Sequence, residues 1–445
     1  MFDQLMKGMS PEGEEKTKEE KPKKSEFEGF TECLLFSETT KITVDEEGVL
    51  ISAVLDQLPI PYDEIISFVF TNYRLEIVTV HGTITISRMG QSGQWLYDHL
   101  YAAYNAAVLK ALLVEGSHEA EVRGVFEAEE NGEIIRGEAF FRLYKDCVCI
   151  LPADDHGRRL PLCFVSGMEK DRLRVTLSLA TGERYMFSMM GSETDFFIEK
   201  LAAALRSLRE RSMKQLRDMD DSLGSMQASI AAKLMPEGVH AAVEKLSLAV
   251  PTLMTTFEHL IQESRISDSY QVLKSLCGND RLFLGIKSST KEEKTQSMLT
   301  ELSAGEKVVG QLIWLIGVSR SGTRAAVELA LPGNEAAATY LYDVQGEPER
   351  FAMMLNRGME ATKFQRELFT LSNEELVKSG HRTEAMLIHR TPSLQLMRKC
   401  FVGRVIHSSQ DKWKKEMEKY FSSVREDETQ EREGKGEQQT RFCTN

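Results

Sequence analysis

The sequence predicts an α+β protein built from repeated antiparallel sheets, each closed by an amphipathic helix. Short segments alternate apolar and polar residues, which is the period of a half-buried strand. After two of these segments the apolar period changes to that of one helix face. The whole strand–turn–strand–helix pattern recurs at a spacing of about 100 residues, for example at Arg74 and Arg174. At 445 residues the chain is too long for one ordinary core, so we expect roughly two to four domains.

The two copies of this pattern share their turn residues. Gly82 and Gly182 lie where each hairpin must turn, and glycine readily adopts the positive φ that tight turns require. A Ser-x-Met-Gly sequence then ends each second strand, at Gly90 and Gly191. One residue has to be inserted after Gly182 to keep the two copies in register.

A helix is expected directly after each of these hairpins. An aromatic residue follows each Ser-x-Met-Gly sequence, Trp95 in the first copy and Phe196 in the second, and we expect the two to be equivalent and buried. Apolar residues then recur at the spacing of one helix face. They are Leu96, Leu100 and Ala103 in the first copy and Phe197, Leu201 and Ala204 in the second.

More strand candidates precede each hairpin. They are Lys41–Val44, Val49–Val54, Ile65–Phe70, Phe140–Ile150 and Leu160–Ser166. Many short antiparallel strands followed by one helix resemble the pleckstrin-homology-like (PH-like) superfold, in which the helix closes one open end of a bent sheet. The resemblance implies one PH-like module over residues 28–113 and a second over residues 119–218. This superfold serves lipid, peptide and structural functions, so it does not define a role.

The remaining chain is expected to hold a connector, a further domain and two tails. Residues 219–280 show mainly helical spacing and are interpreted as a helical connector. Residues 281–423 are predicted to form an α+β domain, with a third PH-like module as one interpretation. Residues 1–27 and 424–445 are rich in charge and poor in apolar side chains, so we expect them to be disordered.

Three features support the expected C-terminal domain. Gln311–Val318 is a strongly apolar strand candidate, and Pro348 suits the first turn of a helix. Near the end, four large apolar residues recur at helical spacing and predict a helix that packs on its own core. They are Trp413, Met417, Tyr420 and Phe421.

Composition limits the partners. The net charge of −13 disfavours general binding to nucleic acid or to anionic lipid, both of which attract clustered Lys and Arg. The acidic segments Val44–Gly48 and Glu127–Glu133 further argue against phosphoinositide binding by the two modules. The longest apolar run, Leu312–Val318, is far shorter than the roughly 20 residues of a membrane span. We therefore expect no nucleic-acid partner and no stable membrane association.

The cysteines predict a reducing, cytoplasmic environment. The chain has seven cysteines, an odd number, and is long enough to bury a core without disulfides. Cys147 and Cys149 would share one face of a strand, but no second Cys or His pair follows at zinc spacing. We interpret them as structural thiols.

One loop is a candidate anion site. The segment Gly317–Thr323 has the spacing of a phosphate-binding Walker loop, but no lysine follows Gly322. No cysteine nucleophile precedes Arg320 either, which argues against a tyrosine-phosphatase loop. A turn rich in hydroxyls and arginine could still bind phosphate or sulfate, and an ordinary hairpin turn is the alternative. The candidate residues are Ser319, Arg320, Ser321, Thr323 and Arg324.

No other motif indicates chemistry. The nine histidines are scattered, and no Gly-x-Ser-x-Gly sequence is present. We therefore predict no catalytic, cofactor-binding or metal-binding residues. The expected function is that of a non-enzymatic scaffold that binds another protein of unidentified nature. Tandem modules with an acidic surface also resemble histone-chaperone subunits, which would imply a basic client protein. The alternatives are an anion- or phosphopeptide-binding module that uses residues 319–324, and an enzyme without a readable motif.

Overall fold

The computed structural model describes residues 25–130, 132–264, 266–288, 311–330, 338–365, 371–376, 379–407 and 409–422. The chain divides after Ala107 into two compact units. The two tails expected to be disordered lie outside the described residues, except that the first strand already begins at Ser25.

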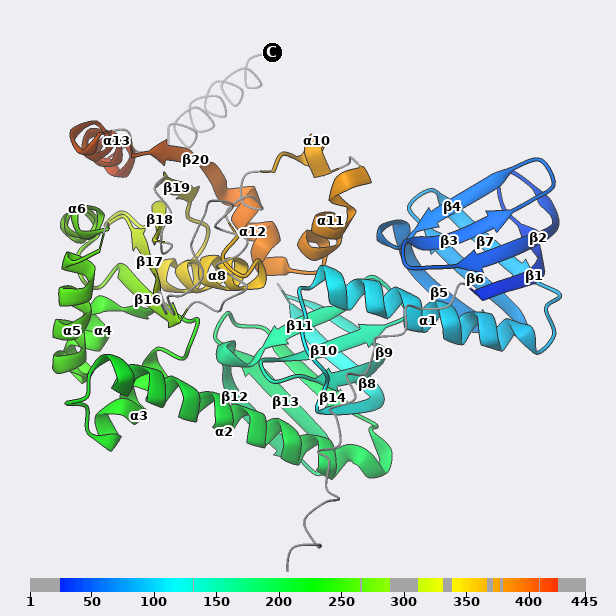
Figure 1. Cartoon of the computed structure of the whole chain (residues 1–445), viewed down its shortest axis with the longest axis horizontal. Coiled ribbons are helices and arrows are strands. Elements are labelled where there is room, and N and C mark those ends of the chain that lie inside the picture. The colour runs from blue at the N-terminus through cyan, green and yellow to red at the C-terminus, as the bar shows by residue number, and fades with distance from the viewer. Residues whose placement is uncertain are drawn as a thin grey trace, which may run out of the picture. The chain divides into compact units, whose positions relative to one another are not determined.

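The first module, residues 25–111, is one antiparallel sheet followed by one helix (Figure 1, blue to cyan). The seven strands lie in the order β4-β3-β2-β1-β7-β6-β5, so the first and last strands of the sequence are neighbours. The elements are β1 (Ser25–Glu32), β2 (Ser37–Val44), β3 (Gly48–Ser52), β4 (Gln57–Pro61), β5 (Ile65–Thr71), β6 (Arg74–Thr79), β7 (Gly82–Ser87) and α1 (Ser92–Ala111).

The second module, residues 120–219, repeats this plan. Its seven strands lie in the order β11-β10-β9-β8-β14-β13-β12, which matches the first sheet strand for strand. Each sheet also has a short 3₁₀ helix and a register break at the start of the fifth strand, at Ile65 and Val165. The elements are β8 (Ala120–Glu130), β9 (Glu133–Leu143), β10 (Cys147–Pro152), β11 (Arg158–Pro161), β12 (Val165–Asp171), β13 (Arg174–Leu179), β14 (Arg184–Ser188) and α2 (Thr194–Met219).

The turn residues shared by the two copies adopt matching backbone conformations. Gly82 and Gly182 have φ values of 140° and 99° in the last hairpin of each sheet. Gly90 and Gly191 have φ values of 56° and 62° where each helix is about to begin. Glycine accepts these conformations without the steric strain that a Cβ causes, which explains the shared spacing.

The helix of each module covers its sheet with the apolar face expected from the sequence. Leu96 and Leu100 of α1 are buried, as are Phe197 and Leu201 of α2. The expected burial of the preceding aromatic is wrong. Trp95 is 64% exposed and Phe196 is 48% exposed, because adjacent residues on a helix point about 100° apart. The side chains that close the sheets are therefore Leu96 and Phe197.

One expected strand is in fact a hairpin. The segment Phe140–Ile150 contains the end of β9, a turn and most of β10, which pairs with β9 in antiparallel register. Cys147 and Cys149 both lie on β10 and are fully buried, with their sulfur atoms 4.0 Å apart. They are free thiols within the core, as the interpretation as structural thiols requires.

The third sheet belongs to a different architecture. Its six strands follow the chain in order, β15-β16-β17-β18-β19-β20, and all neighbours are antiparallel. This order does not repeat that of the first two sheets, so the interpretation as a third copy of the same module is not supported. The strands are β15 (Ala241–Ala242), β16 (Leu282–Ser288), β17 (Gln311–Val318), β18 (Arg324–Ala330), β19 (Ala338–Asp343) and β20 (Phe401–Ile406).

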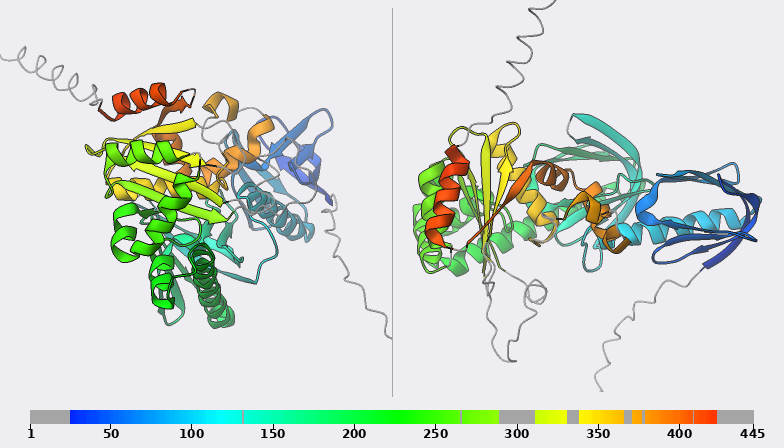
Figure 2. Two further views of the ribbon diagram at one scale, coloured as in Figure 1. Left: turned by 60° about the vertical axis from the view of Figure 1, so that its left-hand side comes forward. Right: turned by 90° about the horizontal axis from the view of Figure 1, so that it is seen from above.

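Helices cover both faces of the third sheet (Figure 2, right). Ile313 and Leu315 of β17 belong to the core shared with the helices on one face, whereas Trp314 contacts Asn356 on the other. A strand buried on both faces is apolar throughout, which explains the unbroken run in β17. The first face carries α3 (Ser225–Leu234), α4 (Val243–Ala249), α5 (Pro251–Gln262), α6 (Ser267–Cys277) and α13 (Gln410–Ser422); the second carries α8 (Pro348–Ala361) and α12 (Pro392–Cys400).

This packing corrects the expected domain plan. The segment 219–280 is not a connector, because its helices share one hydrophobic core with the third sheet and it contributes strand β15. We therefore define residues 225–422 as the C-terminal domain. Trp413 and Met417 of α13 are buried in the same core, so that helix packs on its own domain as expected.

We expect Phe197→Ala to lower the free energy of unfolding by about 3–5 kcal/mol, the usual cost of truncating a buried aromatic. Phe196→Ala is the matched control and should cost less than about 1 kcal/mol, because its side chain is half exposed. Urea unfolding of the full chain, followed by circular dichroism, measures both. Equal losses in the two variants would contradict this assignment of the closing residue.

A second prediction concerns His240, which is buried beside Phe283 with a ring separation of 4.8 Å. Burial lowers the pKa of His240 from 6.5 to about 4. The unfolded chain therefore binds the proton first, and stability should fall as the pH drops from 6.5 towards 4. Between pH 7 and pH 5 this group alone should cost about 2 kcal/mol. Urea unfolding at both pH values should show a smaller loss in His240→Phe; an unchanged loss would contradict the assignment.

Candidate functional site

The loop predicted to bind anions is the hairpin turn between β17 and β18. The hydroxyl oxygen of the buried Ser319 accepts hydrogen bonds from the backbone N–H groups of Thr323 and Arg324, at 3.2 and 3.1 Å. The N–H groups of Ser319 and Gly322 also bond to carbonyl oxygens within the loop. These donors already have partners, so they do not converge on a common point where an anion could bind.

The two arginines of the loop have different surroundings. Arg324 is paired with Asp343, and its guanidinium lies 5.2 Å from the centre of the Tyr420 ring. Arg320 is exposed and reaches the carbonyl oxygen of Ser275. The remaining predicted residues, Ser321 and Thr323, hydrogen-bond to each other at 2.8 Å. This geometry is that of a self-bonded turn.

The acidic segments compared in the sequence are not equivalent in the fold. Residues 45–47 connect β2 to β3, whereas residues 127–133 contain the turn between β8 and β9. The turn of the first module that corresponds to the β8–β9 turn is Cys33–Phe36, between β1 and β2. The Cys33–Phe36 turn is apolar. The two modules therefore differ at this turn, which the sequence comparison of the two acidic segments did not include.

Two hairpin turns of the first module carry exposed aliphatic pairs at their tips. In each turn the first residue donates its N–H to the carbonyl oxygen of the fourth, Cys33 to Phe36 and Ala53 to Asp56. We call the four aliphatic residues at the central positions of these turns the apolar tip. They are Leu34, Leu35, Val54 and Leu55, with exposed fractions of 94%, 66%, 80% and 92%.

The two turns of the apolar tip are neighbours. Strands β2 and β3 pair with Lys41 opposite Ser52, so both turns lie at the same end of the sheet. The N–H of Val54 donates to a carboxylate oxygen of Glu38, at 3.4 Å. Central turn positions usually hold Gly, Asn, Asp or Pro, so two aliphatic pairs there have no local structural reason.

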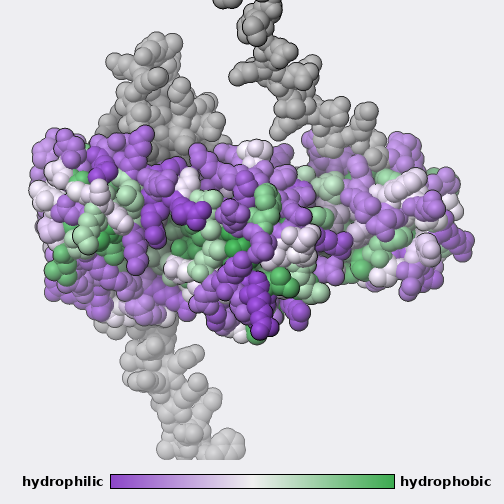
Figure 3. Space-filling view, turned by 90° about the horizontal axis from the view of Figure 1, so that it is seen from below, coloured by the Kyte–Doolittle hydropathy of each residue, from purple (hydrophilic) through white to green (hydrophobic). Residues whose placement is uncertain are grey.

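Acidic side chains border the apolar tip. Glu32 precedes the first turn, Glu38 follows it, and Asp56 closes the second turn. Figure 3 shows a largely polar surface with interspersed apolar residues on the face it draws. Apolar side chains exposed singly are common on proteins, whereas a group at one end of a sheet favours a binding surface.

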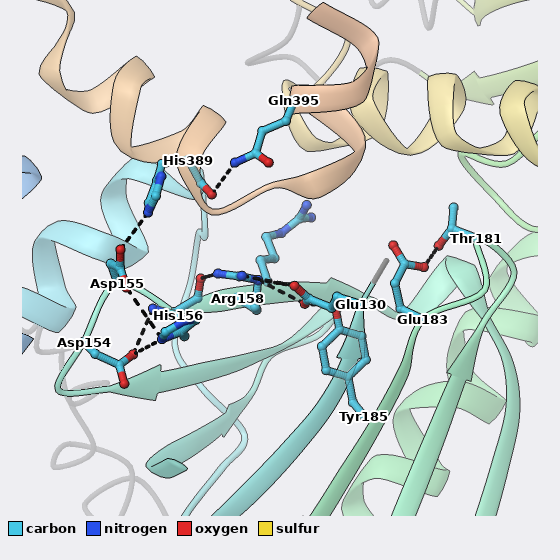
Figure 4. A network of polar contacts seen from close by, with 12 residues as sticks. Glu130, Asp154, Asp155, His156, Arg158, Thr181, Glu183, Tyr185, His389 and Gln395 are labelled. Atoms are coloured by element: carbon cyan, nitrogen blue, oxygen red, sulfur yellow. Dashed lines mark hydrogen bonds and ion pairs between the residues drawn. The ribbon is translucent and has the colours of Figure 1, made fainter. Parts of the chain in front are cut away.

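The β10–β11 turn of the second module, which corresponds to the second turn of the apolar tip, is polar and already has a partner within the chain. The turn between β10 and β11 contains Asp154, Asp155, His156 and Gly157, and it contacts the C-terminal domain (Figure 4). Nε2 of His389, the last residue of α11 (Arg382–His389), lies 2.8 Å from a carboxylate oxygen of Asp155.

Charge holds this hairpin turn in place. Burial opposes ionisation of Asp155, but its hydrogen bond with His389 and the charges of His389, His156 and Arg390 together outweigh that effect, so the pKa of Asp155 is lowered. The hydrogen bond between Nδ1 of His156 and Asp154, at 3.2 Å, raises the pKa of His156. A Cβ at Gly157 would lie 3.6 Å from Nε of Arg390, so this arginine also faces the turn.

Buried ion pairs continue the junction into the interior. Arg158 forms a two-pronged pair with Glu130, which also accepts a 2.6 Å hydrogen bond from the Tyr185 hydroxyl (Figure 4). The adjacent Arg159 makes two hydrogen bonds to Glu360 of α8, at 2.8 and 3.0 Å. Removing one partner of such a pair leaves a buried charge, so Arg159–Glu360 fixes how the second module meets the C-terminal domain, whereas Arg158–Glu130 holds β8 and β11 of the module together.

The sequence contained signals for both hairpin ends. The run Cys33-Leu-Leu-Phe36 between two alternating segments could have marked an apolar turn. The group of two aspartates and a histidine at residues 154–156 was visible too, but its partner His389 is 234 residues from Asp155. Only the fold brings these residues together.

Comparison of the sequence with protein-family models and with curated proteins gives no match. Within the described part of the chain, no helix combines the length and the apolar character that crossing a membrane requires.

The geometry of the 319–324 loop predicts unequal roles for its arginines. Arg324→Ala should lower the free energy of unfolding by about 1–3 kcal/mol, because it removes the ion pair with Asp343. Arg320→Ala is the matched control and should change stability by less than about 0.5 kcal/mol. Urea unfolding of both variants measures this. If phosphate stabilised the parent chain and Arg320→Ala abolished that effect, the loop would be an anion site instead.

Proposed function

We propose that this chain is a non-enzymatic interaction protein with two PH-like modules, of which the first binds a partner protein through the apolar tip. The partner segment is an amphipathic helix that carries both aliphatic and basic side chains. The observation that carries the proposal is the group of four exposed aliphatic residues at two adjacent hairpin ends.

The PH-like assignment is supported by topology. Each module has seven antiparallel strands in the same order, with the helix after the last strand. The helix of each covers a curved sheet with one apolar face. Loops at the rim of such a frame can change without disturbing the core, which makes them suitable for binding.

The contact made by the second module supports the choice of a helical, basic partner. There the corresponding hairpin end meets α11 of the C-terminal domain, and the side chains that face it are His389 and Arg390. In the first module the tip is aliphatic and is bordered by Glu32, Glu38 and Asp56. A partner with aliphatic residues for the tip and basic residues for this border complements both features.

Charge also argues for a protein partner over a membrane. Carboxylates beside the apolar tip would be repelled by an anionic lipid surface, and the net charge of the chain is −13. None of the six cysteines in the described residues forms a disulfide, which suits a cytoplasmic location. No recognisable catalytic motif is present in the sequence, and the proposal therefore assigns no reaction to the chain.

The proposal predicts binding of a synthetic 18-residue helix of leucine and lysine, with the leucines along one face. Leu34→Ser with Leu55→Ser should weaken its binding at least tenfold, because these two side chains are the most exposed of the tip. Fluorescence anisotropy of a labelled peptide measures the dissociation constant. The matched control is Ile134→Ser with Leu173→Ser, two residues of the second module that are 71% and 66% exposed.

Two further arms decide the nature of the partner. A leucine–glutamate helix of the same pattern should bind much more weakly than the lysine helix, because the border of the tip is acidic. Equal weakening by the control pair would indicate unspecific attraction and contradict the proposal. Binding of the parent chain to neutral phosphatidylcholine vesicles, lost in the Leu34/Leu55 variant, would instead make the tip a membrane contact.

A further inference from the structure

Four side chains of metal-ligand type meet where the β10–β11 turn contacts α11. They are Asp154, Asp155, His156 and His389. Figure 4 shows Asp155 between the others, with one of its oxygens towards His389 and the other towards His156, which contacts Asp154. One ligand atom from each of the first three lies within 4.8 Å of the other two. Nε2 of His389 is 2.8 Å from Oδ2 of Asp155. We propose that these residues form a binding site for one divalent transition-metal ion, with Zn²⁺ the best match.

The separations between the side chains suit a metal shell. Bonds of about 2.0–2.2 Å in a tetrahedral site place the ligand atoms roughly 3.2–3.6 Å apart. Nδ1 of His156 is 3.2 Å from an oxygen of Asp154 and 3.5 Å from an oxygen of Asp155. An ion could therefore replace the contacts among these three side chains with little movement of the turn, and the exposed His389 side chain would turn from Asp155 towards the ion to become its fourth ligand.

The ligand types select the class of ion. Two imidazoles and two carboxylates suit zinc and neighbouring transition metals, whereas Ca²⁺ and Mg²⁺ prefer oxygen ligands alone. Two carboxylates also balance the charge of a divalent ion. His389 ends α11, and the partial negative charge of a helix C-terminus favours a cation there.

Two arginines lie nearby, and their positive charge opposes the binding of a cation. Arg158 is paired with Glu130, so its charge is largely neutralised locally. Arg390 acts on Asp155 and reduces the attraction for a cation. The site therefore depends on the direct bonds from its four ligands and not on a general negative field.

The surrounding structure holds the ligands in position. The N–H of His156 donates to Asp154 at 2.8 Å, which fixes the hairpin turn. The side-chain amide of Gln395 donates to the carbonyl oxygen of His389 at 2.8 Å, which fixes the end of α11 (Figure 4). The ligand side chains are 22% to 58% exposed, so an ion can reach them from solvent. A bound ion would join the second module to the C-terminal domain.

Isothermal titration of the full, chelator-treated chain with ZnCl₂ tests the site. The parent should bind one ion per chain. Asp155→Asn and His389→Ala should each weaken zinc binding by at least about tenfold, because changes to residues that only support metal ligands already cost that much. His259→Ala is the matched control. That histidine also lies beside a carboxylate, Glu263 at 3.5 Å, but among the described residues it belongs to no group of three ligand-type side chains, so its loss should leave zinc binding unchanged.

Cobalt substitution separates this site from binding by free thiols. Co²⁺ bound by Asp and His gives weak visible bands, whereas cysteine ligands add intense near-ultraviolet absorption. The expected spectrum lacks that absorption and disappears in His389→Gln. Circular dichroism should show that the metal-free variants retain the parent fold, because His389 is largely exposed. Absence of zinc binding, equal binding in all variants, or a thiolate spectrum would each overturn the proposal.

Discussion

The closure of each bent sheet by the apolar face of one helix is the interaction on which the two modules depend. Leu96 and Leu100 in the first module, and Phe197 and Leu201 in the second, lie fully buried between helix and sheet. A helix that follows the seventh strand can reach this position because the seventh strand pairs with the first. The first and last strands of the module therefore lie in the middle of the sheet. The hairpin ends then lie at the rim, outside the core, where their residues can differ without affecting closure.

That freedom gives the two modules different surfaces on one frame. The second module meets the C-terminal domain through a polar turn and the buried pair Arg159–Glu360, while the buried pair Arg158–Glu130 lies within the module itself. Pairs of this kind add little net stability but penalise any arrangement that leaves one charge alone. They therefore suit a contact that must form in one orientation. Contacts between aliphatic side chains are not directional, so the apolar tip of the first module suits a hydrophobic contact that can form in more than one orientation.

The C-terminal domain illustrates why local patterns were misassigned. Its helices at residues 225–277 have ordinary amphipathic spacing, which is equally consistent with a connector and with one layer of a domain. Their apolar faces share one core with Ile313 and Leu315 of β17, residues far away in the chain. Strands β17 to β19 resemble a module's hairpins in spacing alone, and pairing order, which spacing does not encode, distinguishes the two architectures.

Local chemistry in the sequence determined the α+β composition, the shared turns at Gly82 and Gly182, and the apolar helix faces, because backbone conformation and periodicity depend on near neighbours. Tertiary structure decided which of two adjacent residues, Phe196 or Phe197, enters the core. Adjacent helix residues point about 100° apart, so only one of them can face the sheet. Tertiary structure also decided that Ser319 bonds its own loop and that His389 meets Asp155. Those contacts depend on side-chain direction and on the packing of distant segments, and the spacing of residues in the sequence determines neither.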